Sequence, residues 1–329
     1  MLQAFIDILS NPNFYANVVA VTPPLLLAGL GCAIAQKSGE VQMGMEGIMT
    51  MASFCGVLTA HYVGVILGHP ATWLGLLVSI LVGGLLGYLV AVFNLKLKVD
   101  IVLVGIAMNL LGGGLTAFLL PMVTPNHDRS STGSLLSGVL PEIKIPLLGD
   151  IPYIGNILFN QNILTYIAYI LIIVMAFLMF KTKLGLRIRA VGENSNAAES
   201  VGISSVKIKT IALIISGCLG GLGGAFMSTV YLSYFSTGIV AGRGFIGLAA
   251  CSMGEGNPIP TALTSILFGF FYALSNFART TGISDNLIKS WPYIATMIGL
   301  VIYSVNKKRV ERKRLEGLAA EADKAKEAA

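Results

Sequence analysis

Apolar segments long enough to cross a lipid bilayer are the feature that most constrains this chain. The hydrocarbon core of a bilayer is about 30 Å thick, and about 20 apolar helical residues span it. The chain has 329 residues, of which 55% are hydrophobic and only 12% are charged, and its mean hydropathy is +0.78. Soluble domains carry about 25% charged residues. The sequence therefore predicts an all-α polytopic membrane protein and not a soluble helical bundle.

Nine apolar segments are predicted to be membrane-spanning helices within one transmembrane domain over residues 1–306. The region 228–242 is apolar but interrupted by Gly and Ser, so it is interpreted as a re-entrant element or part of a discontinuous span. Counting this region gives ten elements. The predicted spans are residues 16–36, 45–67, 72–93, 101–123, 163–180, 209–227, 243–253, 259–277 and 291–306.

The distribution of Lys and Arg predicts the orientation, because short cytoplasmic loops are enriched in these residues. The tail over residues 307–329 begins with the basic sequence KKRVERKR, which places the C-terminus in the cytoplasm. Nine crossings then place the N-terminus outside, with 17 Lys and Arg residues inside and four outside. Topology thus explains the net charge of +6, and no nucleic-acid partner is expected.

Two polar connections separate the apolar segments. Residues 124–162 form the longest outer connection, and its Pro and Gly residues divide it into pieces too short to cross, so we expect a cap on the outer surface. Residues 181–209 hold six Lys and Arg residues against two Glu residues. A short helix is predicted there from Glu193, capped by Asn194 or Ser195 and ended by Gly202. Such a helix at the cytoplasmic face is suited to contact a motor subunit.

Two Gly-rich stretches open apolar helices in the predicted topology. Residues 39–47 follow the first span and open the second, and residues 238–247 open the seventh. With nine crossings, the two stretches enter the membrane from opposite faces. This arrangement is typical of inverted repeats whose broken helices meet near the midplane of the membrane.

Polar side chains at membrane depth are candidates for function, because they usually face a bundle interior or a cavity. Glu46 lies at the start of the second span, where it either accepts hydrogen bonds from backbone N–H groups at a helix N-terminus or lines a substrate path. Asn109 lies in the middle of the fourth span. Its carboxamide either bonds a hydroxylated solute or joins two helices.

Aromatic rings and hydroxyl groups gather beside the interrupted region. Tyr231, Ser233 and Phe235 offer ring faces and a hydroxyl suited to a sugar or a base, while an interfacial aromatic belt explains the rings equally well. Arg243 opens the seventh span and is expected to extend to the membrane surface.

No constellation for catalysis or metal binding is recognised in the sequence. There is no pairing of a nucleophile with a base, no His-x-x-x-His pair and no P-loop. The four Cys residues lie in apolar runs without Cys-x-x-Cys spacing and are interpreted as buried hydrophobes. We expect no enzyme activity, no catalytic residue, no metal and no bound cofactor in this chain.

Three stretches together resemble a known family. They are VQMGMEGIMTMASFCG (residues 41–56), GLRIRAVGENSNAAESVGI (residues 185–203) and GRGFIGLAACSMGEGNPIPTAL (residues 242–263). They are similar to motifs of the permease subunits of bacterial ABC importers for ribose, other simple sugars, nucleosides and branched-chain amino acids. Gln42 is a mild departure, since the family usually has Asn there. The outer-loop sequence is most similar to the shorter permease of nucleoside or simple-sugar importers.

The resemblance implies an ATP-driven importer of the bacterial cell membrane. Its expected partners are cytoplasmic ATPase subunits that bind ATP and Mg²⁺, a second permease of paralogous sequence, and an extracellular lipoprotein or periplasmic solute-binding protein. The expected cargo is a nucleoside, with purine nucleosides favoured, or a simple sugar such as ribose. The alternatives are a branched-chain amino-acid permease and, in another class, an ion-coupled secondary transporter. The residues implied to contact the ATPase are Gly192, Glu193, Asn194, Ala197, Ala198 and Gly202.

Overall fold

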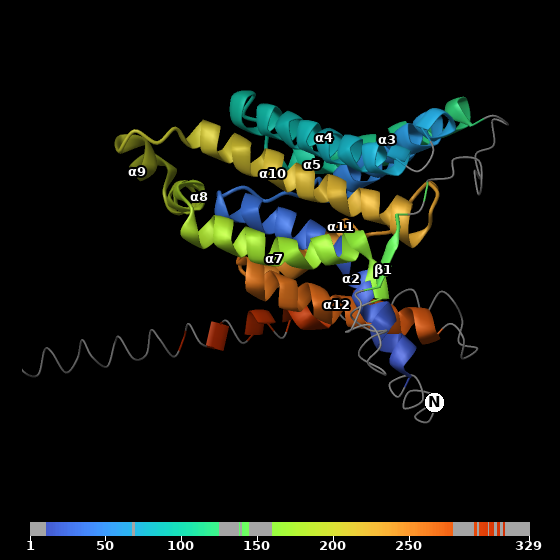
Figure 1. Ribbon diagram of the computed structural model, residues 1–329. Helices are drawn as coiled ribbons and strands as arrows, with labels where there is room; N and C mark the ends of the chain where they lie inside the picture. The colour runs from blue at the N-terminus through green and yellow to red at the C-terminus, as the bar shows by residue number, and fades with distance from the viewer. Residues whose placement is uncertain are drawn as a thin grey trace, which may run out of the picture.

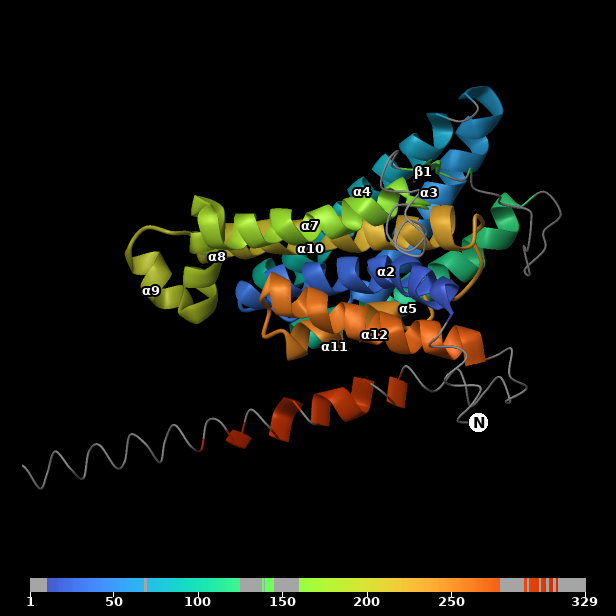
Figure 2. The same cartoon turned by 60° about the horizontal axis from the view of Figure 1, so that its bottom comes forward.

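The molecule is a bundle of long apolar helices with α2 in its interior (Figures 1 and 2). The computed structural model describes residues 11–67, 70–124, 138, 140–144 and 160–278. Between positions 293 and 312 it describes residues 293–294, 296–301, 303–305, 308–309 and 312. Most of the predicted tail over residues 307–329 and most of the outer connection therefore lie outside the described residues.

The described helices follow the apolar segments of the sequence closely. Two π-helical turns, Val92–Lys96 and Met227–Tyr231, extend α4 and α10. The helices are α2 (Pro12–Lys37), α3 (Met45–Leu67), α4 (Pro70–Ala91), α5 (Ile101–Val123), α7 (Ile163–Lys181), α8 (Lys183–Glu193), α9 (Ser195–Ser200), α10 (Ser205–Phe226), α11 (Arg243–Met253) and α12 (Pro258–Ala278).

Polar side chains at the helix starts explain where several helices begin. Asp100 accepts a hydrogen bond from the N–H of Val102 at the start of α5, and Asn162 accepts one from the N–H of Leu164 at the start of α7. Thr182 similarly caps α8. The first N–H groups of a helix have no partner within the helix, and a side-chain oxygen at the cap satisfies them.

Six helices of the described residues are long and apolar enough to cross a membrane, as judged by length and composition. The predicted span over residues 243–253 is α11, whose 11 residues extend only about 16 Å at 1.5 Å per residue. Because that is about half of a bilayer core, α11 does not cross alone. The predicted last span is described in part, as an apolar helix over Thr296–Val305. The all-α membrane fold is confirmed, and the count of nine or ten elements stays a prediction.

Glycine faces bring α4 and α10 into close contact. A Cβ atom added at Gly217 would lie 2.2 Å from the backbone oxygen of Gly83, and one added at Gly83 would lie 2.3 Å from that of Gly217. A Cβ atom at Gly221 would likewise meet the oxygen of Ser79 at 2.3 Å. The Gly-rich run in the sixth predicted span therefore serves helix packing, as small residues do between membrane helices.

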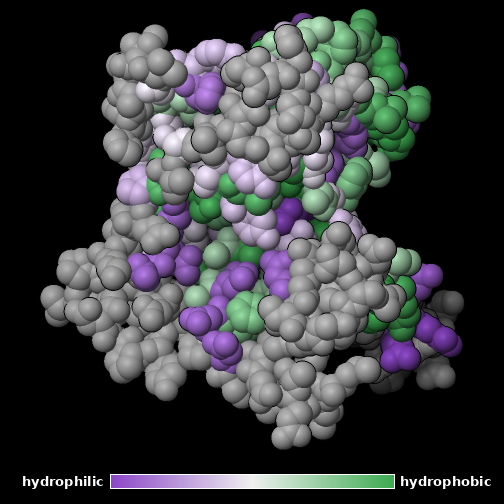
Figure 3. All heavy atoms as spheres, turned by 90° about the vertical axis from the view of Figure 1, so that its right-hand side faces the viewer, coloured by the Kyte–Doolittle hydropathy of each residue, from purple (hydrophilic) through white to green (hydrophobic). Residues whose placement is uncertain are grey.

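The two ends of the bundle differ in composition. One end, which we call the α9 end, carries α8 and α9, while α2 begins at the opposite, N-terminal end (Figure 1). Lys37, Glu40, Asn94 and Lys209 lie together at the α9 end. The segments predicted to lie inside the cell thus gather on one side. Seen from the N-terminal end, hydrophilic residues lie across the middle of the face and a block of hydrophobic residues lies at its upper right (Figure 3).

A small β-ribbon lies near the N-terminal end. Strand β1 (Glu142–Lys144) pairs antiparallel with β2 (Asn160–Asn162), and the side chain of Asn162 donates a hydrogen bond to the carbonyl of Leu140. The sequence of this connection predicts a cap but does not predict these strands. The ribbon pairs the two described segments of that connection with each other, directly before the start of α7.

Candidate functional site

Two groups of candidate residues come together in the structure. The first, which we call the helix junction, consists of Glu46, Asn109, Gly242, Arg243 and Gly244. The second is the coupling segment, which consists of α8 and α9 at the α9 end. Among the described residues, no group of three or more His, Cys, Asp and Glu side chains could hold a metal ion.

The chain reaches the helix junction through a non-helical connector, residues 38–44, between α2 and α3. The side chain of Met45, the first residue of α3, lies against Gly31 of α2 and Gly220 of α10, well inside both helices. Helix α3 therefore begins within the bundle and runs toward the N-terminal end. Helix α11 also begins within the bundle, and it runs toward the α9 end.

Glu46 joins these two helix starts. Its Oε1 accepts a hydrogen bond of 2.7 Å from the N–H of Gly242, and its Oε2 accepts one of 2.8 Å from the N–H of Gly244. The N-terminus of a helix has free N–H groups and a partial positive charge, both of which stabilise a carboxylate. The geometry is that of the first alternative for Glu46, a carboxylate bonded to backbone N–H groups at a helix N-terminus.

Glycine at two positions makes this contact possible. Gly242 has φ of +78°, a left-handed conformation that non-glycine residues adopt only with strain. At Gly244, an added Cβ atom would lie 2.7 Å from the backbone nitrogen of Glu46. A side chain at Gly244 would therefore push the two helix starts apart.

Asn109 holds the start of α3 from the other side. Its Oδ1 accepts a hydrogen bond of 2.8 Å from the N–H of Gly47, and its Nδ2 donates one of 2.9 Å to the carbonyl of Met43. Both ends of the carboxamide are therefore used by the backbone around α3. These two hydrogen bonds are the contacts expected of an Asn109 that joins two helices.

Arg243 does not extend to the membrane surface, which corrects the prediction from the sequence. Its side chain is only 3% exposed, and its guanidinium lies 4.9 Å from the ring centroid of Tyr231 and 4.4 Å from that of Tyr272. Its Nη1 donates to the carbonyl of Val240 at 3.1 Å. Two aromatic rings can hold a desolvated cation, and they keep this one inside the bundle.

The other candidates near the interrupted region occupy different environments. Tyr231 is half-buried, and its hydroxyl accepts a hydrogen bond of 3.4 Å from Nδ2 of Asn276. Ser233 is half-buried with a left-handed φ of +59°. Phe235 is fully buried and packs edge-on against Phe54 at 5.2 Å between ring centroids. Tyr231 thus belongs to the surroundings of Arg243, whereas Phe235 belongs to the hydrophobic core.

The coupling segment contains two helices where the sequence analysis predicted one. The predicted short helix is α9, and Asn194 caps it by accepting a hydrogen bond of 3.0 Å from the N–H of Ala197. Gly202, with φ of +82°, follows its end. The additional helix α8 buries Gly185, Ile188 and Val191. In the sequence, basic residues between these positions interrupt the apolar pattern, so α8 was not predicted as a helix.

The six predicted coupling residues divide by exposure. Glu193, Asn194, Ala197 and Gly202 are exposed at the α9 end, whereas Ala198 is 4% exposed and belongs to the core. Gly192 is also exposed, yet an added Cβ atom there would lie 2.1 Å from the carbonyl oxygen of Lys37. Gly192 therefore provides close contact with the end of α2.

Val201 is a candidate that the sequence analysis missed. It directly follows α9, and its apolar side chain is 73% exposed. An exposed apolar side chain next to a capped surface helix is a suitable anchor for a protein partner. The signal in the sequence was an apolar Val residue directly before Gly202 in a largely polar stretch.

Comparisons with known proteins identify relatives over most of the chain. Residues 14–304 match the family model described as "Branched-chain amino acid transport system / permease component". The chain is 33% identical over 293 residues to the nucleoside ABC transporter permease protein NupC of Lactococcus lactis, covering 88% of this chain and 91% of that protein. It is 35% identical over 282 residues to the guanosine ABC transporter permease protein NupQ of Bacillus subtilis, covering 84% and 87%.

A third relative is assigned to a different cargo. The chain is 32% identical over 314 residues to TsgC13 of Haloferax volcanii, an ABC transporter permease protein provisionally assigned to glucose, covering 88% of this chain and 90% of that protein. No solved structure matches the chain significantly.

Proposed function

Because the chain belongs to the branched-chain amino acid transport system / permease component family, we propose that it is the membrane permease subunit of an ATP-driven nucleoside importer. The observation that carries the proposal is the similarity to NupC and NupQ, whose names assign them to nucleosides and to guanosine. Both similarities extend over more than four fifths of each chain. The chain itself is a transport subunit and not an enzyme.

In this proposal the coupling segment receives the movement of an ATPase subunit. Helix α9 supplies the exposed residue Ala197, and the exposed Val201 directly follows this helix. Glu193 and Asn194 lie beside them. ATP and Mg²⁺ bind to the ATPase subunits and not to this chain. The α9 end faces the cytoplasm, and the N-terminal end faces the outside. This orientation is supported by the Lys and Arg residues that the coupling segment contributes to the α9 end.

The helix junction is proposed to be the element that rearranges during transport. Helices α3 and α11 begin inside the bundle and run in opposite directions, which supports an inverted repeat with broken helices. Glu46 links the two helix starts by hydrogen bonds to backbone N–H groups. Tyr231 and Ser233, in the half-buried region before α11, are proposed to line part of the substrate path.

Two proposed partners complete the path and supply the cargo. A second permease, paralogous to this one, pairs with the chain across the translocation path, and a lipoprotein or periplasmic solute-binding protein delivers the nucleoside from outside. The lipid-facing side includes α5 and α7, because only 28% of the residues in the apolar 18-residue stretch of each helix are buried. The expected location is the bacterial cell membrane.

Other cargoes remain as alternative proposals. The description of the matching family names branched-chain amino acids, and TsgC13 is provisionally assigned to a simple sugar, but neither cargo is favoured over a nucleoside. The ion-coupled transporter is not favoured, because the relatives NupC and NupQ are named as ABC transporter permeases.

Uptake measurements separate these cargoes. Cells that carry or lack this subunit, with its companion subunits present, are given radiolabelled guanosine, uridine, ribose and leucine in parallel. Loss of ATP-dependent guanosine and uridine uptake alone is the expected result. Loss of only ribose or only leucine uptake would replace the nucleoside with that cargo, and no change in any uptake would contradict all three proposals.

A further inference from the structure

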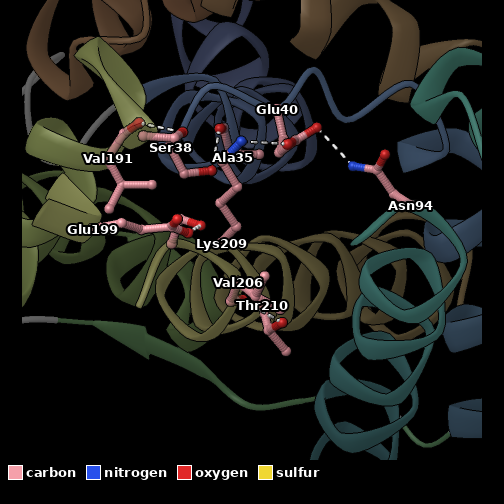
Figure 4. Close-up of polar contacts among 11 residues, drawn as sticks. Ala35, Ser38, Glu40, Asn94, Val191, Glu199, Val206, Lys209 and Thr210 are labelled. Atoms are coloured by element: carbon pink, nitrogen blue, oxygen red, sulfur yellow. Dashed lines mark hydrogen bonds and ion pairs between the residues drawn. The ribbon is translucent and has the colours of Figure 1, made fainter. Parts of the chain in front are cut away.

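The carboxylate of Glu40 joins three separate elements at the α9 end (Figure 4). Its Oε1 forms an ion pair of 2.9 Å with Nζ of Lys209 on α10, and its Oε2 accepts a hydrogen bond of 2.7 Å from Nδ2 of Asn94 on the π-helical extension of α4. The side chains are 11% exposed for Glu40 and 18% exposed for Lys209. Water and salt screen such sheltered charges less than exposed ones. The position of the connector is therefore coupled to the position of α10.

Helix α9 is linked directly to the start of α10. The carboxylate of Glu199 accepts a hydrogen bond from the hydroxyl of Ser205, the first residue of α10. The N–H of Ile203 also donates to the carbonyl of Ala198, which closes the turn between the two helices. Lys209 lies four residues after Ser205 and therefore on the same helix face one turn later. A displacement of α9 is thus carried to Lys209 through less than two turns of helix.

The connector leads from Glu40 to the helix junction within six residues. Asn109 holds the carbonyl of Met43, and Glu46 holds the start of α11. Six extended residues reach at most about 20 Å, so movement of Glu40 is not absorbed by a long flexible loop. The contacts form a continuous series from α9 through Lys209 and Glu40 to α11.

We propose that Glu40 and Lys209 are positioning residues for transport, and that their ion pair transmits the movement of α9 to the helix junction. This inference rests on the proposed function, in which α9 contacts an ATPase. Neither residue touches the cargo. The connector moves with α10 only while the opposite charges are paired.

The test uses the complete importer in proteoliposomes, with its ATPase, its partner permease and its solute-binding protein. The measured quantity is the amount of tritiated guanosine imported per ATP hydrolysed. In Glu40→Gln and in Lys209→Met, ATP hydrolysis continues and this ratio falls about tenfold, a size typical of lost coupling between sites. The double variant Glu40→Lys/Lys209→Glu, which restores opposite charges, recovers most of the ratio.

Matched controls separate the ion pair from general effects. Lys207→Met removes a positive charge from an exposed position two residues from Lys209 and leaves the ratio unchanged. Lys209→Arg keeps the charge and also keeps the ratio. If either neutral single variant fails to assemble, the charge-swapped variant and Lys209→Arg still test the pair, because both retain two opposite charges.

Two results would overturn the inference. One is an unchanged ratio in both neutral single variants. The other is an assembled charge-swapped variant whose ratio stays as low as that of the single variants. Failure of the proposed function is recognised separately: in that case the unmodified complex imports no guanosine, or Ala197→Glu on α9 leaves guanosine import intact.

Discussion

The carboxylate of Glu46 accepts a hydrogen bond of 2.8 Å from the backbone N–H of Gly244, a residue 198 positions later in the chain. The contact places the starts of α3 and α11 against each other inside the bundle. A carboxylate in that position satisfies N–H groups that no water in a bilayer core would reach. It also makes the two halves of the chain depend on each other for stability.

Glu46→Gln tests that dependence. The substitution keeps the size of the side chain but points an amide donor at one of the two backbone N–H donors. Because hydrogen bonds to charged groups contribute about 1.5–3 kcal/mol, we expect a loss of stability of about that size. Thermal unfolding of the purified protein in detergent measures it, with the exposed Glu193→Gln as the control. An unchanged unfolding midpoint together with lost uptake would instead place Glu46 in the substrate path.

Asn109→Leu should destabilise the start of α3. The variant leaves the N–H of Gly47 and the carbonyl of Met43 without their side-chain partner, and each buried unsatisfied group costs about 1–3 kcal/mol. Hydrogen exchange of the α3 amides, followed by mass spectrometry, should show earlier opening. The neighbouring Leu110 is 72% exposed, so Leu110→Ala should leave this exchange unchanged. Equal protection in both variants would contradict the role assigned to Asn109.

Gly217→Ala should weaken the packing of α4 against α10. The new methyl group would meet the backbone oxygen of Gly83, which cannot move without shifting the helix, and overpacking of this kind costs about 1–3 kcal/mol. Gly113→Ala on α5 is the matched control, because an added Cβ atom there has no other atom within 4 Å. The unfolding midpoint in detergent should be lower for Gly217→Ala than for Gly113→Ala. Equal midpoints would mean that the contact between α4 and α10 accommodates a methyl group at Gly217.

Val201→Ser should reduce binding of the ATPase subunit. In the proposed contact with the ATPase, the apolar side chain of Val201 is buried. Its loss lowers the binding free energy by about 1.5 kcal/mol, which corresponds to about tenfold weaker binding. The amount of ATPase retained by the immobilised permease over a concentration series gives this affinity. Leu186→Ser, which changes the exposed apolar residue of α8 instead, distinguishes the end of α9 from the rest of the coupling segment. Unaltered affinity in Val201→Ser would exclude Val201 as an anchor.

Features that depend on nearby residues could be predicted from the sequence. Helices α3, α5 and α11 begin and end at the predicted residues, because hydropathy and turn residues act locally. The cap of α9 by Asn194 follows from the same local rules. The length of α11 also shows the limit of this approach, since an apolar segment was interpreted as a crossing although it is too short for one.

Features that depend on distant partners could not be predicted. The burial of Arg243 requires the rings of Tyr231 and Tyr272, which come from two other elements. The sequence alone predicts a surface position for Arg243, because that is the usual place for an isolated arginine in a membrane protein. Glu40 was not a candidate at all, since its partner Lys209 is 169 positions away.

The pairing of Glu46 with α11 has a consequence for how the protein is made. When α3 leaves the ribosome, the residues that will bind its carboxylate have not yet been synthesised. At about 5–20 residues per second, the 198 positions from Glu46 to Gly244 take on the order of 10–40 s to translate. For that interval the nascent chain holds a carboxylate next to the membrane without its final partners. Until α11 emerges, the apolar residues that follow Glu46 in α3 have to offset the free-energy cost of this carboxylate in the membrane.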